Sequence, residues 1–220
     1  MKLSAAIFDM DGLLLDTERV CLDAFSAACN EVGAPCLVDV YLSTIGCGEQ
    51  EIFDILTAGY KEIFNYSVIH EKWRVLYEDA ALHAPTPLKP GVKNIIAWLQ
   101  DHDIPIAVAT STRREHAIKK LKMAGIYACF DQLVGGDEIE NSKPAPDIYL
   151  EAARRLSVLP NEGIAFEDSN TGVKAAMAAG LHTFQIPDLI QPSDEVIALG
   201  VNIRPSLDEA LQHVRILFNE

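Results

Sequence analysis

The sequence predicts an α/β fold in which a doubly wound parallel β-sheet carries a small inserted all-helical domain. Two observations predict the sheet: apolar strand-like runs alternate with amphipathic helices from Pro90 onward, and a further apolar run, KLSAAIF, stands at the N-terminus. A third observation predicts the insertion, because residues 17–86 show helical periodicity with few strand signals. We therefore expect a core of residues 1–16 and 87–220 and a helical domain of residues 17–86.

From Pro90 onward the expected strands of the core alternate with expected helices. In GVKNIIAWLQDHD the apolar residues Val92, Ile95, Ile96 and Leu99 recur at the spacing of an amphipathic helix. Strands that alternate with helices of this length form parallel sheets with helices on both faces. The other expected helices are REHAIKKLKMAG, PDIYLEAARRL and TGVKAAMAAG, and the expected strands are residues 2–8, 104–109, 130–136, 163–166 and 182–186.

Composition and charge exclude several classes of partner. The 220 residues include 18 Lys and Arg against 32 Asp and Glu, which gives a net charge of −14, and no basic run resembles a nucleic-acid footprint. The five cysteines are odd in number and include no C-x-x-C pair, which is typical of free thiols in a reduced compartment. No apolar segment has the length of a signal peptide or a membrane span. We expect a cytoplasmic monomer that binds neither nucleic acid nor membranes.

The stretch IFDMDGLLLDT places two carboxylates, Asp9 and Asp11, at the end of the first expected strand. If the extended geometry persists, both point to the same side and repel each other unless a cation or a proton compensates them. The alternative is an acidic turn in which Gly12 supplies a special backbone angle. An EF-hand calcium loop is excluded, because it needs an acidic residue at Leu13 and a glycine at Leu14.

Polar residues also follow the other expected strands, at the edge of the sheet where α/β proteins bind ligands. Glu167 and Asp168 follow GIAF, and with Asp9 they offer the oxygen ligands that Mg²⁺ prefers. The alternative is a helix-capping loop in which Asp168 or Ser169 is the cap. Thr110 is either a helix-start hydroxyl or an anion ligand. Lys143 is either a solvated lysine or a lysine positioned by the prolines around it.

Four motifs together resemble those of the haloacid dehalogenase superfamily. DMDGLLLDT, VATST, SKPAPDIY and EDSNTGVKAA stand in the same order and at similar spacings, and the resemblance spans the whole chain. Within this superfamily the chain resembles the branch of phosphatases and β-phosphoglucomutases. This resemblance implies a Rossmann-like core with an inserted helical cap. The resemblance further implies that the cap is hinged near residues 15–17 and 84–88 and closes over the active site.

The resemblance implies a catalytic or phosphate-binding role for residues of the first three motifs. Asp9 becomes the nucleophile that forms an aspartyl-phosphate, and Asp11 becomes the acid and base, which must begin protonated beside an ionised Asp9. Thr110 and the backbone amide of Ser111 hold the phosphoryl oxygens. Lys143 offsets the negative charge between nucleophile and phosphate.

The resemblance also implies a Mg²⁺ cofactor. Its ligands are the carboxylate of Asp9, the backbone carbonyl of Asp11 and the carboxylate of Asp168, with Glu167 as a further ligand, directly or through water. Candidate substrate contacts are Gly46, Thr112 and Arg113.

The expected function is a Mg²⁺-dependent phosphatase for a small phosphorylated metabolite, either a sugar phosphate or a nucleoside monophosphate. FDMDGLLLDTER is also similar to the opening of pseudouridine 5′-phosphatases. A β-phosphoglucomutase is the alternative, although Cys21 and Glu49 stand where mutases usually have a histidine and a basic residue.

Two other functional classes fit the sequence less well than a phosphatase or a mutase. Dehalogenases of the same superfamily generally lack the second aspartate, which Asp11 supplies here. A phospho-receiver signalling domain, the non-enzyme alternative, has its acceptor aspartate on a later strand and lacks a helical insertion of this length.

Overall fold

The computed structural model describes residues 4–45, 47 and 49–217, and the chain divides into two compact units. The first, which we call the core unit, runs to Asp16 and resumes at Pro87. The second, the helical unit, is Thr17–Thr86, so it begins where helix α1 (Thr17–Val32) begins and ends shortly after helix α4 (Tyr66–His83).

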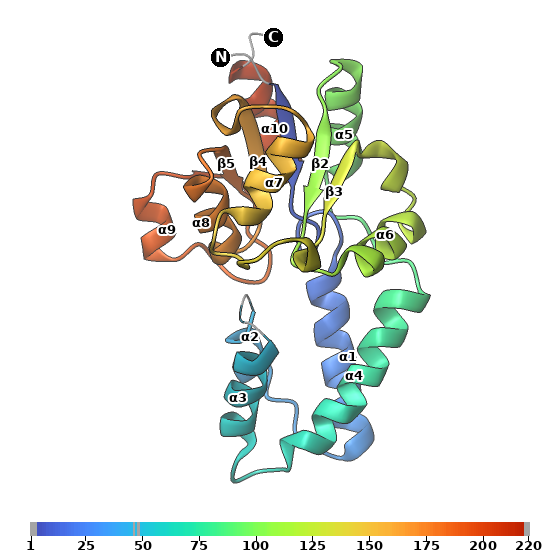
Figure 1. The fold of residues 1–220 in the computed structure, drawn as a ribbon. Coiled ribbons are helices and arrows are strands. Elements are labelled where there is room, and N and C mark those ends of the chain that lie inside the picture. Colours follow the sequence, from blue (N-terminus) through green and yellow to red (C-terminus); the bar gives the residue numbers. More distant parts are fainter. Residues whose placement is uncertain (1–3, 46, 48, 218–220) are drawn as a thin grey trace. The chain divides into compact units, whose positions relative to one another are not determined.

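A parallel sheet forms the centre of the core unit, which confirms the predicted fold class. Within the described residues six strands pair in the order β3-β2-β1-β4-β5-β6, and β1 therefore lies in the interior of the sheet (Figure 1). Every pairing is parallel. The strands are β1 Ala5–Phe8, β2 Ile106–Ala109, β3 Gln132–Val134, β4 Gly163–Glu167, β5 His182–Gln185 and β6 Asn202–Ile203.

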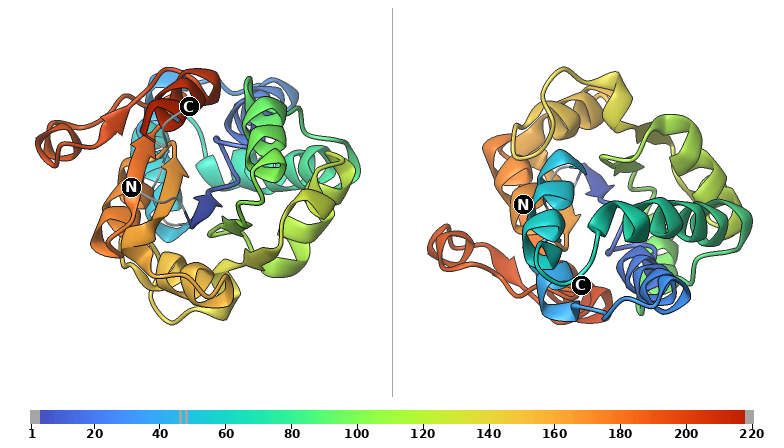
Figure 2. Two further views of the ribbon diagram at one scale, coloured as in Figure 1. Left: turned by 90° about the horizontal axis from the view of Figure 1, so that it is seen from above. Right: turned by 90° about the horizontal axis from the view of Figure 1, so that it is seen from below.

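Helices cover both faces of this sheet, because successive strand side chains alternate between the faces. On one face Phe8 and its neighbours pack against α5 (Val92–Asp101), α6 (Arg114–Met123) and α10 (Leu207–Leu217). On the other face Ile7 and its neighbours pack against α7 (Asp147–Arg155) and α8 (Asn170–Ala178). Figure 2 shows these two layers of helices on opposite sides of the strands.

Some predicted bounds were wrong. The predicted strand 104–109 begins only at Ile106, after Pro105, which has no N–H to donate to a neighbouring strand. The predicted strand 130–136 ends at Val134, because Gly135 and Gly136 turn to lie against the loop that follows β2. The prediction also omitted β6, α9 (Asp194–Ala198) and α10. Short 3-10 turns at Tyr127–Cys129, Gly136–Glu138 and Pro160–Glu162 complete the core unit.

The helical unit has a core of its own. Its helices are α1, α2 (Val38–Leu42), α3 (Glu49–Tyr60) and α4. Aromatic rings fill the space between these helices, with Phe25 stacked on Tyr41 at 4.9 Å between ring centroids and Trp73 edge-on to both. The buried Tyr60 hydroxyl donates to the Pro35 carbonyl at 2.8 Å and accepts from the Leu37 amide at 3.0 Å.

The two segments that connect the units are hydrogen-bonded to each other inside the core unit. The Asp16 amide donates to the Pro87 carbonyl at 2.9 Å, and the Lys89 amide donates to the Leu14 carbonyl at 3.0 Å. Leu15 and Leu88 form an isolated antiparallel bridge between these bonds. The chain therefore leaves and re-enters the core unit at adjacent points.

The state of the cysteines agrees with the sequence analysis. All five cysteines are thiols rather than disulfides. Among the helices of the described residues, none has both the length and the apolar character that crossing a membrane requires.

The packing of α5 against the sheet predicts a large effect of truncation at Ile95. This side chain is fully buried, so Ile95→Ala should lower the free energy of unfolding by about 2–5 kcal/mol. Ile216→Ala, at a position that is 71% exposed, is the matched control and should change it by less than about 0.5 kcal/mol. Urea unfolding followed by circular dichroism measures both, and equal effects would contradict the packing described.

Candidate active site

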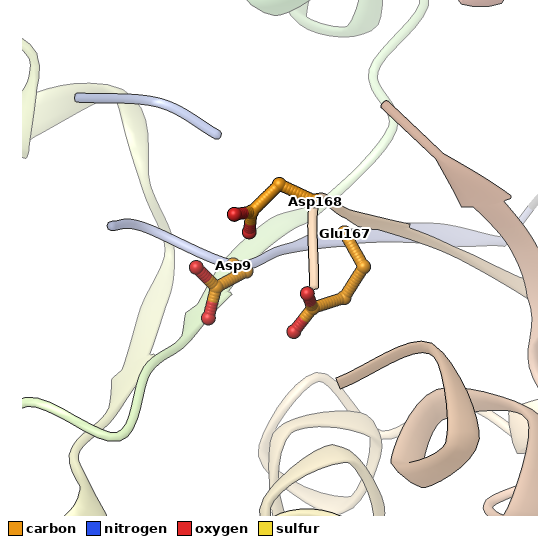
Figure 3. A group of neighbouring side chains, drawn as sticks. All are labelled: Asp9, Glu167 and Asp168. Carbon is orange, nitrogen blue, oxygen red and sulfur yellow. The ribbon is translucent and has the colours of Figure 1, made fainter. Parts of the chain in front are cut away.

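Three carboxylates meet where the neighbouring strands β1 and β4 end. Phe8 and Phe166 are paired in register, so Asp9 and Glu167 come next on adjacent strands, followed by Asp168. One carboxylate oxygen from each of the three residues lies within 4.8 Å of the other two, and the three side chains lie close together (Figure 3). Asp9 is 6% exposed, Glu167 0% and Asp168 8%, so the group is almost entirely removed from solvent.

Lys143 supplies a positive charge inside this group. Its ammonium donates to Asp9 Oδ1 at 2.5 Å and also to Glu167 Oε1, and the side chain is 7% exposed. Burial alone would lower the pKa of this ammonium, but Asp9 and Glu167 outweigh it and raise the pKa above its ordinary value. Lys143 is therefore a positioned cation rather than a solvated surface lysine.

One ammonium does not compensate three buried carboxylates. Burial raises the pKa of the Asp9 carboxyl to about 8, and Lys143 only partly opposes this rise. The negative charges of Glu167 and Asp11 add to it. The group is therefore short of positive charge, and a further cation would favour the ionised form of Asp9.

Glu167 is held by four protein donors. Lys143 and the Tyr149 hydroxyl donate to Oε1, the latter at 2.8 Å, while the amide and the hydroxyl of Ser169 each donate to Oε2 at 3.0 Å. A Cβ at Gly172, on α8, would lie 1.8 Å from Oε1, so only a glycine leaves room for this carboxylate. Ser169 also caps α8, since its hydroxyl accepts from the Gly172 amide at 3.0 Å.

Gly12 brings the backbone close to Asp168. Its φ of +85° is in the left-handed region, and a Cβ at this position would lie 2.4 Å from Asp168 Oδ2. The Asp168 carbonyl accepts from Gln185 Nε2, at the end of β5, at 3.1 Å. Both neighbours restrict Asp168, and the glycine of the first motif is explained by its left-handed turn and by this close approach.

Asp11 has a cation of its own. Lys120, on α6, donates to Asp11 Oδ1 at 2.9 Å, and the Thr112 hydroxyl donates to Oδ2 at 2.6 Å. The Thr110 hydroxyl lies 3.3 Å from the same Oδ2. The two carboxylates of the first motif are thus compensated separately, Asp9 by Lys143 and Asp11 by Lys120. The sequence analysis expected Asp11 to begin protonated beside an ionised Asp9, and that expectation stays a prediction.

The loop after β2 carries the remaining predicted residues. Thr110 is buried at its start and its hydroxyl accepts from the Thr112 amide at 3.1 Å, whereas Ser111 and Arg113 are exposed. The Gly136 amide donates to the Thr112 carbonyl at 3.1 Å, and a Cβ at Gly136 would lie 2.2 Å from the Ser111 carbonyl oxygen. The two glycines after β3 therefore let this loop pack backbone to backbone. Gly46, a predicted substrate contact, lies outside the described residues.

The ligand set fits a hard divalent cation. Carboxylate oxygens from Asp9, Glu167 and Asp168 converge, and oxygen ligands suit Mg²⁺. The shortage of positive charge around Asp9 also favours a cation here. Asp9 and Asp168 are the more available ligands, because Glu167 already accepts four hydrogen bonds.

Sequence reasoning missed three residues that support this site: Lys120, Tyr149 and Gly172. The signal for Lys120 was its place on α6, where helical periodicity puts it on the same face as the buried Ala117 and Leu121. Tyr149 and Gly172 lie within two of the quoted motifs, but their contacts with Glu167 depend on the packing of α7 and α8 against the sheet.

Comparisons with known proteins agree on one family. The model of haloacid dehalogenase-like hydrolases matches residues 6–186. A "Phosphorylated carbohydrates phosphatase" of Thermotoga maritima is 35% identical over 184 residues, which is 81% of this chain and 82% of that protein. A "Probable pseudouridine-5'-phosphatase" of Drosophila melanogaster is 30% identical over 193 residues, 85% of this chain and 83% of that protein.

A solved structure extends the likeness to the whole chain. The crystal structure of a "putative beta-phosphoglucomutase" from Thermotoga maritima superposes with a TM-score of 0.77 at 29% sequence identity. The superposition covers 98% of this chain and 99% of the other. The similarity therefore includes both units of the fold.

The close approach of Gly172 to Glu167 predicts an unusual response to alanine. Helix propensity alone would make Gly172→Ala stabilising by up to about 1 kcal/mol. We expect it to destabilise the protein instead, because the new Cβ displaces Glu167 from its four donors. Thermal unfolding measures the sign of the effect, with Ala178→Gly at an exposed position of the same helix as a control for propensity. A raised melting temperature in Gly172→Ala would contradict the contact.

Proposed function

This chain belongs to the haloacid dehalogenase-like hydrolase family, among its phosphatases, and on that premise we propose that it is a Mg²⁺-dependent phosphatase acting on a small phosphorylated metabolite through an aspartyl-phosphate. The observation that carries the proposal is the buried Asp9, which is held by Lys143 within a group of three carboxylates. A nucleophilic carboxylate has to approach a dianionic phosphate, and this arrangement provides positive charge where the two negative charges meet.

The reaction has two steps. In the first, the Asp9 carboxylate attacks phosphorus, the bond to the leaving oxygen breaks with its electron pair, and that oxygen takes a proton from Asp11. In the second, Asp11 accepts a proton from a water molecule whose oxygen attacks the same phosphorus. The bond to Asp9 then breaks, its electron pair returns to the carboxylate, and phosphate is released.

In this proposal the acidic residues bind the metal ion, and Lys143 offsets part of the negative charge. Asp9, Asp168 and the backbone carbonyl of Asp11 would hold Mg²⁺, with Glu167 as a further ligand. When bound, the ion offsets the negative charge of the phosphate and the carboxylates. Lys143 keeps Asp9 oriented and partly neutralised throughout.

The loop after β2 binds the transferred group in this proposal. The Thr110 hydroxyl and the Ser111 amide would hold phosphoryl oxygens at the carboxyl end of β2, just before α6 begins. Thr112, Arg113 and Gly46 are the proposed substrate contacts. We further propose that the helical unit acts as a cap that selects the leaving group.

The named relatives guide the choice of substrates. One is named for phosphorylated carbohydrates and the other for pseudouridine 5′-phosphate, so a sugar phosphate or a nucleoside monophosphate is the proposed substrate class. The likeness to a structure named as a β-phosphoglucomutase supports the second candidate, a mutase. The family match argues against the phospho-receiver alternative.

We expect phosphate release that depends on Asp9. Wild type, Asp9→Asn and the control Asp101→Asn, an exposed aspartate on α5, are assayed with Mg²⁺ on phosphorylated sugars and nucleotides, including pseudouridine 5′-phosphate. Asp9→Asn should lose at least about a thousandfold in rate, because its amide is not a nucleophile, while Asp101→Asn keeps the wild-type rate. Conversion of β-glucose 1-phosphate to glucose 6-phosphate with little release would favour the mutase instead. Turnover that survives in Asp9→Asn would refute both.

Metal removal should abolish activity reversibly. A chelator is expected to stop phosphate release, and added Mg²⁺ should restore it. Asp168→Asn should raise the Mg²⁺ concentration needed for half-maximal activity by about tenfold or more, since it removes a charged oxygen ligand. The control Asp101→Asn should leave that concentration unchanged. An Asp168→Asn enzyme with wild-type Mg²⁺ dependence would show that the ion binds elsewhere.

A further inference from the structure

Lys120 lies in an unusual place for a lysine. It is on the face of α6 that packs against the sheet, between the buried Ala117 and Leu121, and it is 5% exposed. An apolar side chain would suit this face of the helix, and a buried ammonium carries a large desolvation cost. Helix packing alone does not explain a lysine at this position, whereas the ion pair with Asp11 does.

The contacts fix the orientation of the Asp11 carboxyl group. Lys120 donates to Oδ1 at 2.9 Å, and Thr112 donates to the other oxygen, Oδ2, at 2.6 Å. A carboxyl group with both oxygens engaged has little freedom to rotate. The Asp11 side chain is 24% exposed, so burial by itself does not fix its rotamer.

The orientation so fixed is next to the proposed phosphate site. Asp11 Oδ2 lies 3.3 Å from the Thr110 hydroxyl, which we assign to a phosphoryl oxygen. A carboxyl group held there would lie beside the phosphate that Thr110 is proposed to bind. Lys143 donates to Asp9 and Glu167, whereas Lys120 donates to Asp11, so the role of Lys120 is a separate one.

We propose that Lys120 is a positioning residue that, with Thr112, holds Asp11 in the orientation from which it passes a proton to the leaving oxygen. The proposal rests on the phosphatase function proposed above and adds a residue to it. Lys120 acts in this role through Asp11, rather than by touching the substrate or the metal. Its loss should therefore affect those substrates whose leaving oxygen needs a proton.

Leaving-group dependence separates this role from a structural one. We compare kcat/KM, which reports the steps up to the first phosphoryl transfer, for an alkyl phosphate that the wild type hydrolyses and for p-nitrophenyl phosphate. Nitrophenolate leaves without protonation, so the loss of a positioned acid should affect it little. Lys120→Met should lower kcat/KM at least about tenfold on the alkyl phosphate and less than about twofold on p-nitrophenyl phosphate.

Two further variants complete the comparison. Lys120→Arg keeps the charge and should recover part of the lost activity on the alkyl phosphate. Lys119→Met, at an exposed position one residue earlier on α6, is the matched control and should behave as wild type. If Lys120→Met does not fold, Lys120→Gln replaces it in the same comparison, because an amide still donates one hydrogen bond but lacks the charge.

A double variant tests whether Lys120 acts through Asp11. In an Asp11→Asn background, Lys120→Met should reduce kcat/KM by less than about twofold, because the carboxyl group it positions is already absent. Equal losses on the two substrates, or a full further loss in that background, would overturn the proposal and indicate a general structural role. Asp9-dependent turnover in the wild type is measured alongside. Its absence would refute the proposed function itself, whereas its presence with an unaffected Lys120→Met would refute only this inference.

Discussion

Buried negative charge is the constraint on which the site depends. Asp9, Glu167 and Asp168 come together at the edge of the sheet with little solvent around them, and such a group is unfavourable without compensating positive charge. Lys143 provides part of it by donating to two of the three carboxylates at once. The remaining deficit is visible in the raised pKa of Asp9, and it is the physical reason that a divalent cation suits this position.

The fold satisfies this constraint through backbone geometry. The parallel pairing of β1 with β4 puts Asp9 and Glu167 side by side, and α7, which follows the loop that carries Lys143, supplies Tyr149. Two glycines make the close packing feasible, because a side chain at Gly12 or Gly172 would overlap the acidic group. The carboxylates therefore restrict both of these neighbouring positions to glycine.

The two aspartates of the first motif are paired with different lysines. Asp9 is tied to Lys143 near the sheet, and Asp11 is tied to Lys120 on α6. Each carboxylate has an ammonium beside it, which offsets the repulsion that two close carboxylates would otherwise have. The two residues, for which we propose different roles, therefore have different surroundings.

The sequence by itself determined the parallel α/β fold, the placement of Asp9, Thr110 and Asp168 at strand ends, and the family. Period-two and period-3.6 patterns, turn residues and short motifs are local properties, so one chain displays them directly. Only the tertiary structure decided which cation meets which carboxylate. Lys120 reads as one of several basic residues of α6, and it reaches Asp11 because that helix packs on the sheet at one particular rotation. Contacts between residues over a hundred positions apart depend on packing, which no local pattern encodes.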